Sequence, residues 1–414
     1  MTTTTPSAAT PAAMPLAARL RVPGAFALGA VLLLGVAPLA LSDFRLSLLA
    51  KYLCYAIVAV GVSLAWGRGG LMVLGQGVFF GLGGYAMAMH LKLADAAATG
   101  ETLPDFMQLY GTGDALPWWW RPFANPAFAL LMTVLLPMAV AALLGFFVFQ
   151  RRVKGAYFAI LSQALAAALS IWLVGQQATT GGTNGLTDIQ GFFGYSLDDP
   201  VNQRLVYLVI AVVLLLLMIA ARQLFVSRYG ELLVAVRDSE ERVRFLGYNP
   251  ATVKLVAYVV AAGMAGLAGA LFVPAVGIIS PALIGIVPSI GFVIGAAVGG
   301  RASLVGAVLG AIAVAWAQST LSDAFPAAWT YLQGLLFVLA VGFLPGGLAS
   351  LLTVVRRRRR TTTPTPGETG IRTKSGGTGI RTTAGDTGTV AAIGEAGTLT
   401  TTGETGSRTT GGTT

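Results

Sequence analysis

The residue types that most often carry out catalysis are almost absent from this sequence of 414 residues. It contains one histidine, His90, and one cysteine, Cys54. A Ser-His-Asp triad needs a histidine beside its nucleophile, and a structural zinc site needs several thiolate or imidazole ligands. One cysteine also cannot form a disulfide within the chain. We therefore expect neither an enzyme nor a metal-binding protein.

The polar side chains inside the apolar stretches are uncharged. The run from Gly69 to Gly77 holds four glycines around Gln76. This density predicts a broken helix, which a bilayer tolerates where protein or a water-filled cavity surrounds it. Close helix packing through small residues is the alternative interpretation. A path lined by uncharged polar groups suits a small neutral or zwitterionic solute better than an ion. The candidate path residues are Gly75, Gln76, Gly77, Ser162, Gln163, Thr183 and Asn184.

Ionisable residues are missing from the centres of the apolar stretches. Proton-driven carriers place such residues at membrane depth, because a relay needs groups that titrate. If the chain transports a solute, we expect the energy to come from another subunit. Sodium coupling through backbone carbonyls remains an alternative.

The segment 228–251 carries charges of both signs around several apolar residues. Helices that lie on a membrane surface are usually rich in Lys and Arg on their polar face. Mixed charge favours a protein partner, and an amphipathic linker on the inner leaflet is the alternative.

The run Ala235-Val236-Arg237-Asp238-Ser239-Glu240, followed by Leu246-Gly247-Tyr248, resembles the coupling loop of LivM-like permeases of branched-chain amino-acid-type ATP-binding-cassette (ABC) transporters. Residues 242–248 are most similar to the urea permeases called UrtC. The resemblance spans about residues 45–350 and includes 77–89, 103–107, 181–188, 265–271 and 276–281. The chain departs from the family pattern at Gln76, where a His is usual, at Gly291 in place of Glu, and at Pro345-Gly346-Gly347 in place of Pro-Lys-Gly.

The resemblance implies a permease subunit of an ATP-driven importer for urea or a similar small polar solute. Its implied partners are a second, LivH-like permease, two cytoplasmic ATPase subunits and an extracellular solute-binding protein. ATP and Mg²⁺ would bind to the ATPases, so we expect no cofactor in this chain. The implied contacts with the ATPases are Glu231, Ala235, Arg237, Asp238, Glu240 and Gly247.

Two alternatives remain at this stage. A permease for branched-chain or other amino acids would have the same architecture. A stand-alone secondary transporter or channel belongs to a different class, and the coupling segment and the lack of membrane charges weigh against it.

The elements that must position these residues follow from the composition. Hydrophobic residues make up 55% of the chain and charged residues only 11%, against about 25% charged in soluble domains. We therefore predict an all-α polytopic protein of the plasma membrane with about ten spans, some of them broken or re-entrant. The predicted spans are 24–41, 48–66, 70–91, 127–149, 156–174, 205–222, 253–274, 283–300, 303–319 and 329–352.

The positive charges orient these spans. With the N-terminus in the cytoplasm, 22 of the 27 Lys and Arg residues fall on the cytoplasmic side. The outer side holds Arg45, Lys51, Lys92, Arg121 and Arg204. Cytoplasmic loops of membrane proteins carry this excess of positive charge, so both termini are expected inside.

The two ends of the chain differ from the permease domain, 24–355. Residues 1–23 are predicted to be a disordered cytoplasmic N-terminus. Residues 356–414 begin with five arginines, a stop for the last span, and continue as a nine-residue Thr/Gly repeat. The repeat lacks the aspartate that calcium-binding nonapeptides need, and its composition cannot form a core.

Deleting residues 361–414 should leave solute uptake unchanged, because a disordered tail contributes nothing to the path. Uptake by cells that carry the truncated chain, normalised to the amount inserted in the membrane, tests this. A loss of uptake at equal insertion would show that the tail has a function.

Overall fold

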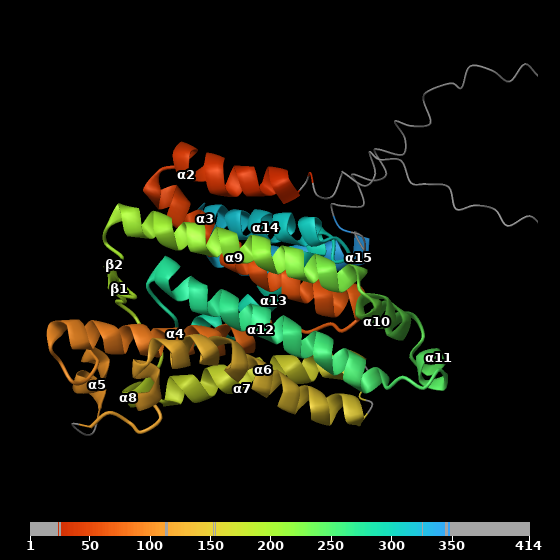
Figure 1. Ribbon diagram of the computed structural model, residues 1–414, viewed down its shortest axis with the longest axis horizontal. Coiled ribbons are helices and arrows are strands. Elements are labelled where there is room, and N and C mark those ends of the chain that lie inside the picture. Colours follow the sequence, from red (N-terminus) through yellow and green to blue (C-terminus); the bar gives the residue numbers. More distant parts are fainter. Residues whose placement is uncertain are drawn as a thin grey trace, which may run out of the picture. The chain divides into compact units, whose positions relative to one another are not determined.

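The computed structural model describes residues 24–347 except 25, 112–114, 152, 154, 325 and 344–346. In this part of the chain, long helices lie side by side (Figure 1). The helices are η1 (Val31–Val36), α2 (Ala37–Ala40), α3 (Asp43–Val62), η2 (Ser63–Arg68), α4 (Gln76–Thr99), α5 (Asp105–Tyr110), η3 (Arg121–Ala124), α6 (Pro126–Gln150), α7 (Gly155–Gly175), α8 (Gln177–Thr180), α9 (Pro200–Val226), α10 (Arg228–Asp238), α11 (Glu240–Phe245), α12 (Pro250–Val276), η4 (Pro281–Leu283), α13 (Ile286–Gly299), α14 (Leu304–Ala324) and α15 (Pro326–Phe343). Two short strands, β1 (Gly191–Phe192) and β2 (Tyr195–Ser196), pair antiparallel.

The predicted all-α membrane fold is confirmed. Within the described residues, seven helices are long and apolar enough to cross a bilayer. They are Asp43–Arg68, Pro126–Gln150, Gly155–Gly175, Pro200–Val226, Pro250–Val276, Pro281–Gly299 and Leu304–Ser322. Each lies at a range that the sequence predicted as a span.

The other three predicted spans also coincide with helices, but these are not among the seven. Phe26–Ala40 is a shorter apolar helix. The span predicted over 70–91 begins as a helix only at Gln76, and the one predicted over 329–352 is helical from Pro326 to Phe343. The predicted N-terminal segment 1–23 and the tail 356–414 lie outside the described residues.

Three of the long helices begin in the same way. Asn125, Asp199 and Asn249 each precede a proline, and each side chain accepts a hydrogen bond from the backbone N–H two residues further on. The cap satisfies one free donor of the first turn, and the proline occupies a position where no N–H is needed. These Asx-Pro pairs therefore fix the residue at which each of α6, α9 and α12 begins.

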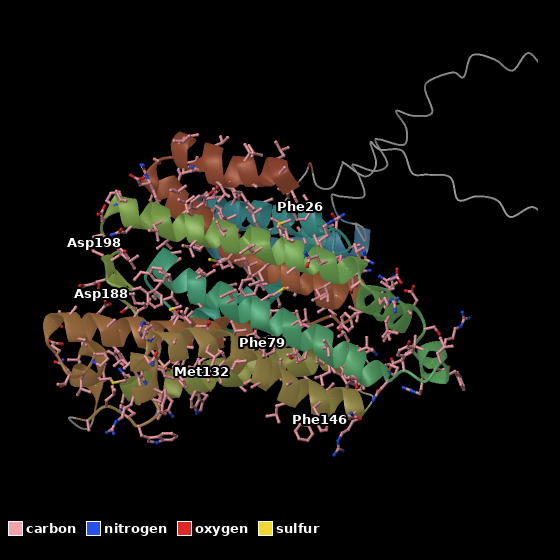
Figure 2. All side chains as sticks on the ribbon, viewed as in Figure 1. Phe26, Phe79, Met132, Phe146, Asp188 and Asp198 are labelled. Atoms are coloured by element: carbon pink, nitrogen blue, oxygen red, sulfur yellow. The ribbon has the colours of Figure 1, made fainter. Side chains whose placement is uncertain are left out.

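Helix α12 packs against α3, α4 and α6. Its contact with α4 is made by backbone, because a Cβ on Gly269 would collide with the Phe80 carbonyl oxygen, and one on Gly83 with that of Gly266. Small residues allow this approach, and such van der Waals contact drives helix association in lipid. Phe79, fully buried, lies inside the bundle, whereas Phe146 of α6 points outward (Figure 2).

The contact between α12 and α6 uses a proline. Pro137 lies inside α6 and has no N–H, which leaves the Thr133 carbonyl without its helical partner. A Cβ on Gly266 would collide with that carbonyl oxygen. The glycine therefore brings its Cα to the freed carbonyl, the geometry of a weak C–H···O contact.

The two ends of the helices carry different loops. Helices α10 and α11 lie at one end, and α5, α8 and the strand pair lie at the other (Figure 1). Asp188 and Asp198 are at the second end (Figure 2). The positive-inside rule assigns the α10 end, which is rich in arginine, to the cytoplasm.

Replacing Gly269 by Ala should force α4 and α12 apart and lower the free energy of unfolding by about 3 kcal/mol, the upper range for overpacking. Thermal unfolding of the purified protein in detergent measures this as a lower midpoint temperature. Gly334→Ala is the matched control, because nothing lies within 4 Å of the added Cβ. Equal midpoints for both variants would contradict a backbone contact between the two helices.

Candidate solute path and coupling segment

The predicted break in the chain is present. Helix α3 continues into the π-helical turn η2, which ends at Arg68, and α4 starts at Gln76. The seven residues between them, 69–75, are not helical. We call this stretch the linker 69–75. The sequence placed the discontinuity in the right run of glycines.

Neighbouring helices hold the junction between the linker and α4. The Leu74 N–H donates to Ser162 Oγ of α7 at 3.2 Å, and the Gly77 N–H donates to Ser289 Oγ of α13 at 3.1 Å. A Cβ on Gly75 would collide with the Ser162 carbonyl oxygen, and one on Gly77 with the Ile284 carbonyl oxygen. Backbone donors freed by the break thus find hydroxyl partners, as a low-dielectric surrounding requires.

Two glutamines beside this junction have buried amides. Gln76 is fully buried, and neither its amide oxygen nor its amide nitrogen has a hydrogen-bond partner. The amide of Gln163, the residue after Ser162, is in the same condition. An unpaired buried polar group costs about 1–3 kcal/mol. Because native cores seldom leave such amides unpaired, Gln76 and Gln163 are candidates for hydrogen bonds to a solute or to water.

The structure separates the predicted path residues into two groups. Gly75, Gln76, Gly77 and Ser162 meet at the start of α4, with Gln163 next to Ser162. Thr183 and Asn184 are exposed instead. They sit in a glycine-rich turn that is tied to the chain after α12 by a bridge between Leu186 and Ile279. Their uncharged polar character, by which we selected them, does not distinguish an exposed turn from a buried path.

The predicted coupling segment is a pair of short helices. α10 and α11 are divided at Ser239, and Leu233, Val236 and Val243 are buried beneath them. Phe245 and Leu246, at the end of α11, are 90% and 75% exposed. The segment therefore presents an apolar tip away from the helices that it covers.

The predicted ATPase contacts differ in their surroundings. Glu231, Ala235, Asp238 and Gly247 are exposed. Glu240 is half-buried, accepts a hydrogen bond from Lys254 and lies 3.7 Å from the Arg244 guanidinium. The side chain of Arg237 is 38% exposed, and its Nη1 donates to the Gly67 carbonyl oxygen at 2.9 Å. Arg237 thus faces the linker as well as the surface.

One polar centre at the outer end did not stand out in the sequence. Lys92, counted there as an outer-loop charge, is 4% exposed, and its Nζ donates to Asp105 Oδ2 at 3.2 Å and to the Asp188 carbonyl oxygen at 3.0 Å. Partial burial raises the pKa of the Asp105 carboxyl, but hydrogen bonds from its own N–H and from Lys92 outweigh this and hold the pKa below its usual value. These residues line a cavity of about 490 Å³. Lys92 and Asp105 are 13 residues apart, and no helical or strand period in the sequence indicates that they form a pair.

A bundle of apolar helices with an interrupted helix and a surface helix pair at one end defines a multi-pass membrane protein. The family model for the branched-chain amino acid transport system permease component matches residues 44–341. The chain belongs to this family and is therefore a permease component of an ABC transporter of the plasma membrane.

Two curated relatives agree with this assignment. The chain is 27% identical over 343 residues to the high-affinity branched-chain amino acid transport system permease protein LivM of Escherichia coli K12, covering 77% of this chain and 73% of the relative. The corresponding LivM protein of Salmonella typhimurium LT2 gives the same identity and coverage. No solved structure matches the chain significantly.

Replacing Gln76 by Met should separate a structural role of this residue from a transport role. The substitution removes an unpaired buried amide and keeps the side chain's length, so the free energy of unfolding should rise by about 1–3 kcal/mol. Uptake should nevertheless fall at least tenfold if the amide faces the solute. Thermal unfolding and uptake by the same preparation measure the two effects. Unchanged uptake would remove Gln76 from the path.

Proposed function

We propose that this chain forms part of the translocation path of an ABC importer for branched-chain or other amino acids. The observation that carries the proposal is the match of the permease family over residues 44–341, together with the substrate class that the names of both relatives state. The comparisons support the amino-acid alternative better than urea, for which the likeness of residues 242–248 to UrtC was the argument.

The geometry at the start of α4 agrees with a zwitterionic solute. A glutamine amide both donates and accepts hydrogen bonds, so Gln76 and Gln163 can meet a carboxylate and an ammonium group without a fixed charge. The N-terminus of a helix also favours a carboxylate, and broken helices in transporters use it in this way. We propose Gly75, Gln76, Gly77, Ser162 and Gln163 as the lining of this part of the path, with Thr183 and Asn184 nearer its outer mouth.

The remaining subunits follow from the same assignment. A LivH-like permease would complete the membrane domain, two ATPases would dock at the cytoplasmic end, and an extracellular binding protein would deliver the solute. The exposed residues of the coupling segment, Glu231, Ala235, Asp238 and Gly247, supply the ATPase contact in this proposal. Arg237 and Glu240 lie next to them in the chain and bond to Gly67 and Lys254 of this subunit. ATP and Mg²⁺ belong to those ATPases.

Uptake decides between the two substrates. Proteoliposomes that hold this chain with its permease partner and ATPases, supplied with the binding protein, should accumulate labelled leucine when ATP is inside. Labelled urea should not accumulate above the level of liposomes without the chain. Accumulation of urea but not of leucine would overturn the amino-acid proposal, and uptake of either solute by this chain alone without ATP would favour a stand-alone carrier.

A further inference from the structure

The coupling helix α10 is bonded directly to the broken part of the chain. Arg237 Nη1 donates to the carbonyl oxygen of Gly67, near the end of η2. The aliphatic part of the same side chain lies on Gly70, where an added Cβ would stand 2.7 Å from Arg237 Cγ. Gly70 has φ +68°, which a glycine adopts without strain. Arg237 therefore contacts the residues on either side of the end of η2, Gly67 before it and Gly70 after it.

A second side chain of α10 supports this contact. Leu233, one turn before Arg237, is fully buried. A Cβ on Gly69 would lie 3.3 Å from Leu233 Cδ1. Residues 233 and 237 are four apart and so lie on the same face of α10. That face is packed on the start of the linker 69–75.

The turn η2 is held by other parts of the protein as well. Ser63 Oγ donates to the Arg301 carbonyl oxygen at 2.8 Å, and the Arg301 guanidinium lies 4.8 Å from the centre of the Trp66 ring. The Arg68 guanidinium lies 4.6 Å from the centre of the Phe225 ring. Since η2 is anchored on these sides, a movement of α10 that pulls on Gly70 acts on the linker.

The linker leads directly to the proposed solute site. Gly70 and Gln76 are six residues apart, a span of at most about 20 Å of extended chain. The linker ends at the hydrogen bond between Leu74 and Ser162, next to the buried Gln76 amide. Gly69, Gly70 and Leu71 still donate to carbonyls of η2, whereas residues 72–75 donate no helical hydrogen bond. Residues 72–75 can therefore change their dihedral angles more readily than a helix, as hinge segments do.

We propose that Arg237 is a positioning residue that transmits movement of α10 to the linker 69–75 and so to the start of α4. The proposal rests on the proposed function, because it assumes that ATPases act on the coupling segment. It divides the segment into two surfaces. The exposed tip of α11, with Phe245 and Leu246, faces outward toward a partner, and Arg237 faces inward toward the path. Asp238, which accepts from Arg237 Nε at 2.9 Å, holds the guanidinium between them.

The test uses the complete transporter in proteoliposomes and compares Arg237→Gln with the control Arg228→Gln. Arg228 is exposed at the start of the same helix, so both variants lose one positive charge from α10. We expect Arg237→Gln to keep the ATPases bound and to hydrolyse ATP at the basal rate. Loss of one hydrogen bond to a charged group shifts the equilibrium between linked and unlinked α10 about tenfold or more toward the unlinked state. The number of solute molecules moved per ATP should fall accordingly. Arg228→Gln should match the wild type.

Amide hydrogen exchange supplies a readout that does not depend on transport. Exchange at residues 70–75 should be faster than in the wild type in Arg237→Gln and unchanged in Arg228→Gln. Exchange at residues 240–246 should be the same in the two variants. Should Arg237→Gln fail to fold or to insert into the membrane, Arg237→Lys decides, because lysine keeps the charge and the aliphatic stem but not the planar donor set. The proposal requires faster exchange at 70–75 and a lower transport ratio in that variant. Wild-type values of both would overturn it.

The outcomes separate this inference from the proposed function. If wild-type liposomes do not take up leucine, the proposed function fails whatever the Arg237 variants do. If they do and Arg237→Gln loses its ATPases, Arg237 is a docking residue, which overturns the transmission role and leaves the proposed function standing. If the variant couples hydrolysis to uptake normally, the transmission role is wrong.

Discussion

The need to satisfy backbone polar groups in a medium without water governs this structure. A helix does so internally, whereas the linker 69–75 and the first turn of α4 do so only in part. Gly69, Gly70 and Leu71 donate back to η2, but the donors of Leu74 and Gly77 depend on partners brought from elsewhere in the chain. Ser162 of α7 serves Leu74, and Ser289 of α13 serves Gly77. Arg237 of α10 takes up the carbonyl of Gly67 just before the break. Helices α7, α13 and α10 thus all bond to the chain around this one interruption. The proposed path and the coupling segment are therefore connected through it.

The architecture was largely readable from the sequence because apolar length is a strong signal in membrane proteins. The ranges of the long helices and the break before Gln76 follow from patterns along the chain, whereas the helices α10 and α11 of the coupling segment were not predicted. The Asx-Pro pairs before α6, α9 and α12 are local signals of the same kind. The predicted number of ten spans is a weaker inference, since the helix at Phe26–Ala40 is short and the one after the break starts late.

The candidate site was readable only in part. Composition identified the run around Gln76, because a high density of glycine and an isolated amide side chain can both be read directly from the sequence. It grouped Thr183 and Asn184 with that run, although they lie in an exposed turn. It also gave no indication that Lys92 is buried or that Arg237 reaches Gly67. Both depend on which residues from distant parts of the chain come together, and neither pairing has a sequence period. The substrate class came from relatives, since a path without charges accepts many small polar solutes.

The meeting of Pro137, Thr133 and Gly266 has a consequence for how the bundle tolerates its surroundings. Apolar side chains at a helix interface compete with lipid tails, which are equally good neighbours. A freed carbonyl is different, because hydrocarbon offers it no donor, and here it rests on the Cα of a glycine that no acyl chain can replace. Gly269 likewise brings its backbone against the Phe80 carbonyl, which lies in the unbroken helix α4. Helices α4, α6 and α12 are therefore joined by contacts that neither a lipid nor a detergent imitates, and a change of bilayer thickness or composition acts first on the helices outside this trio.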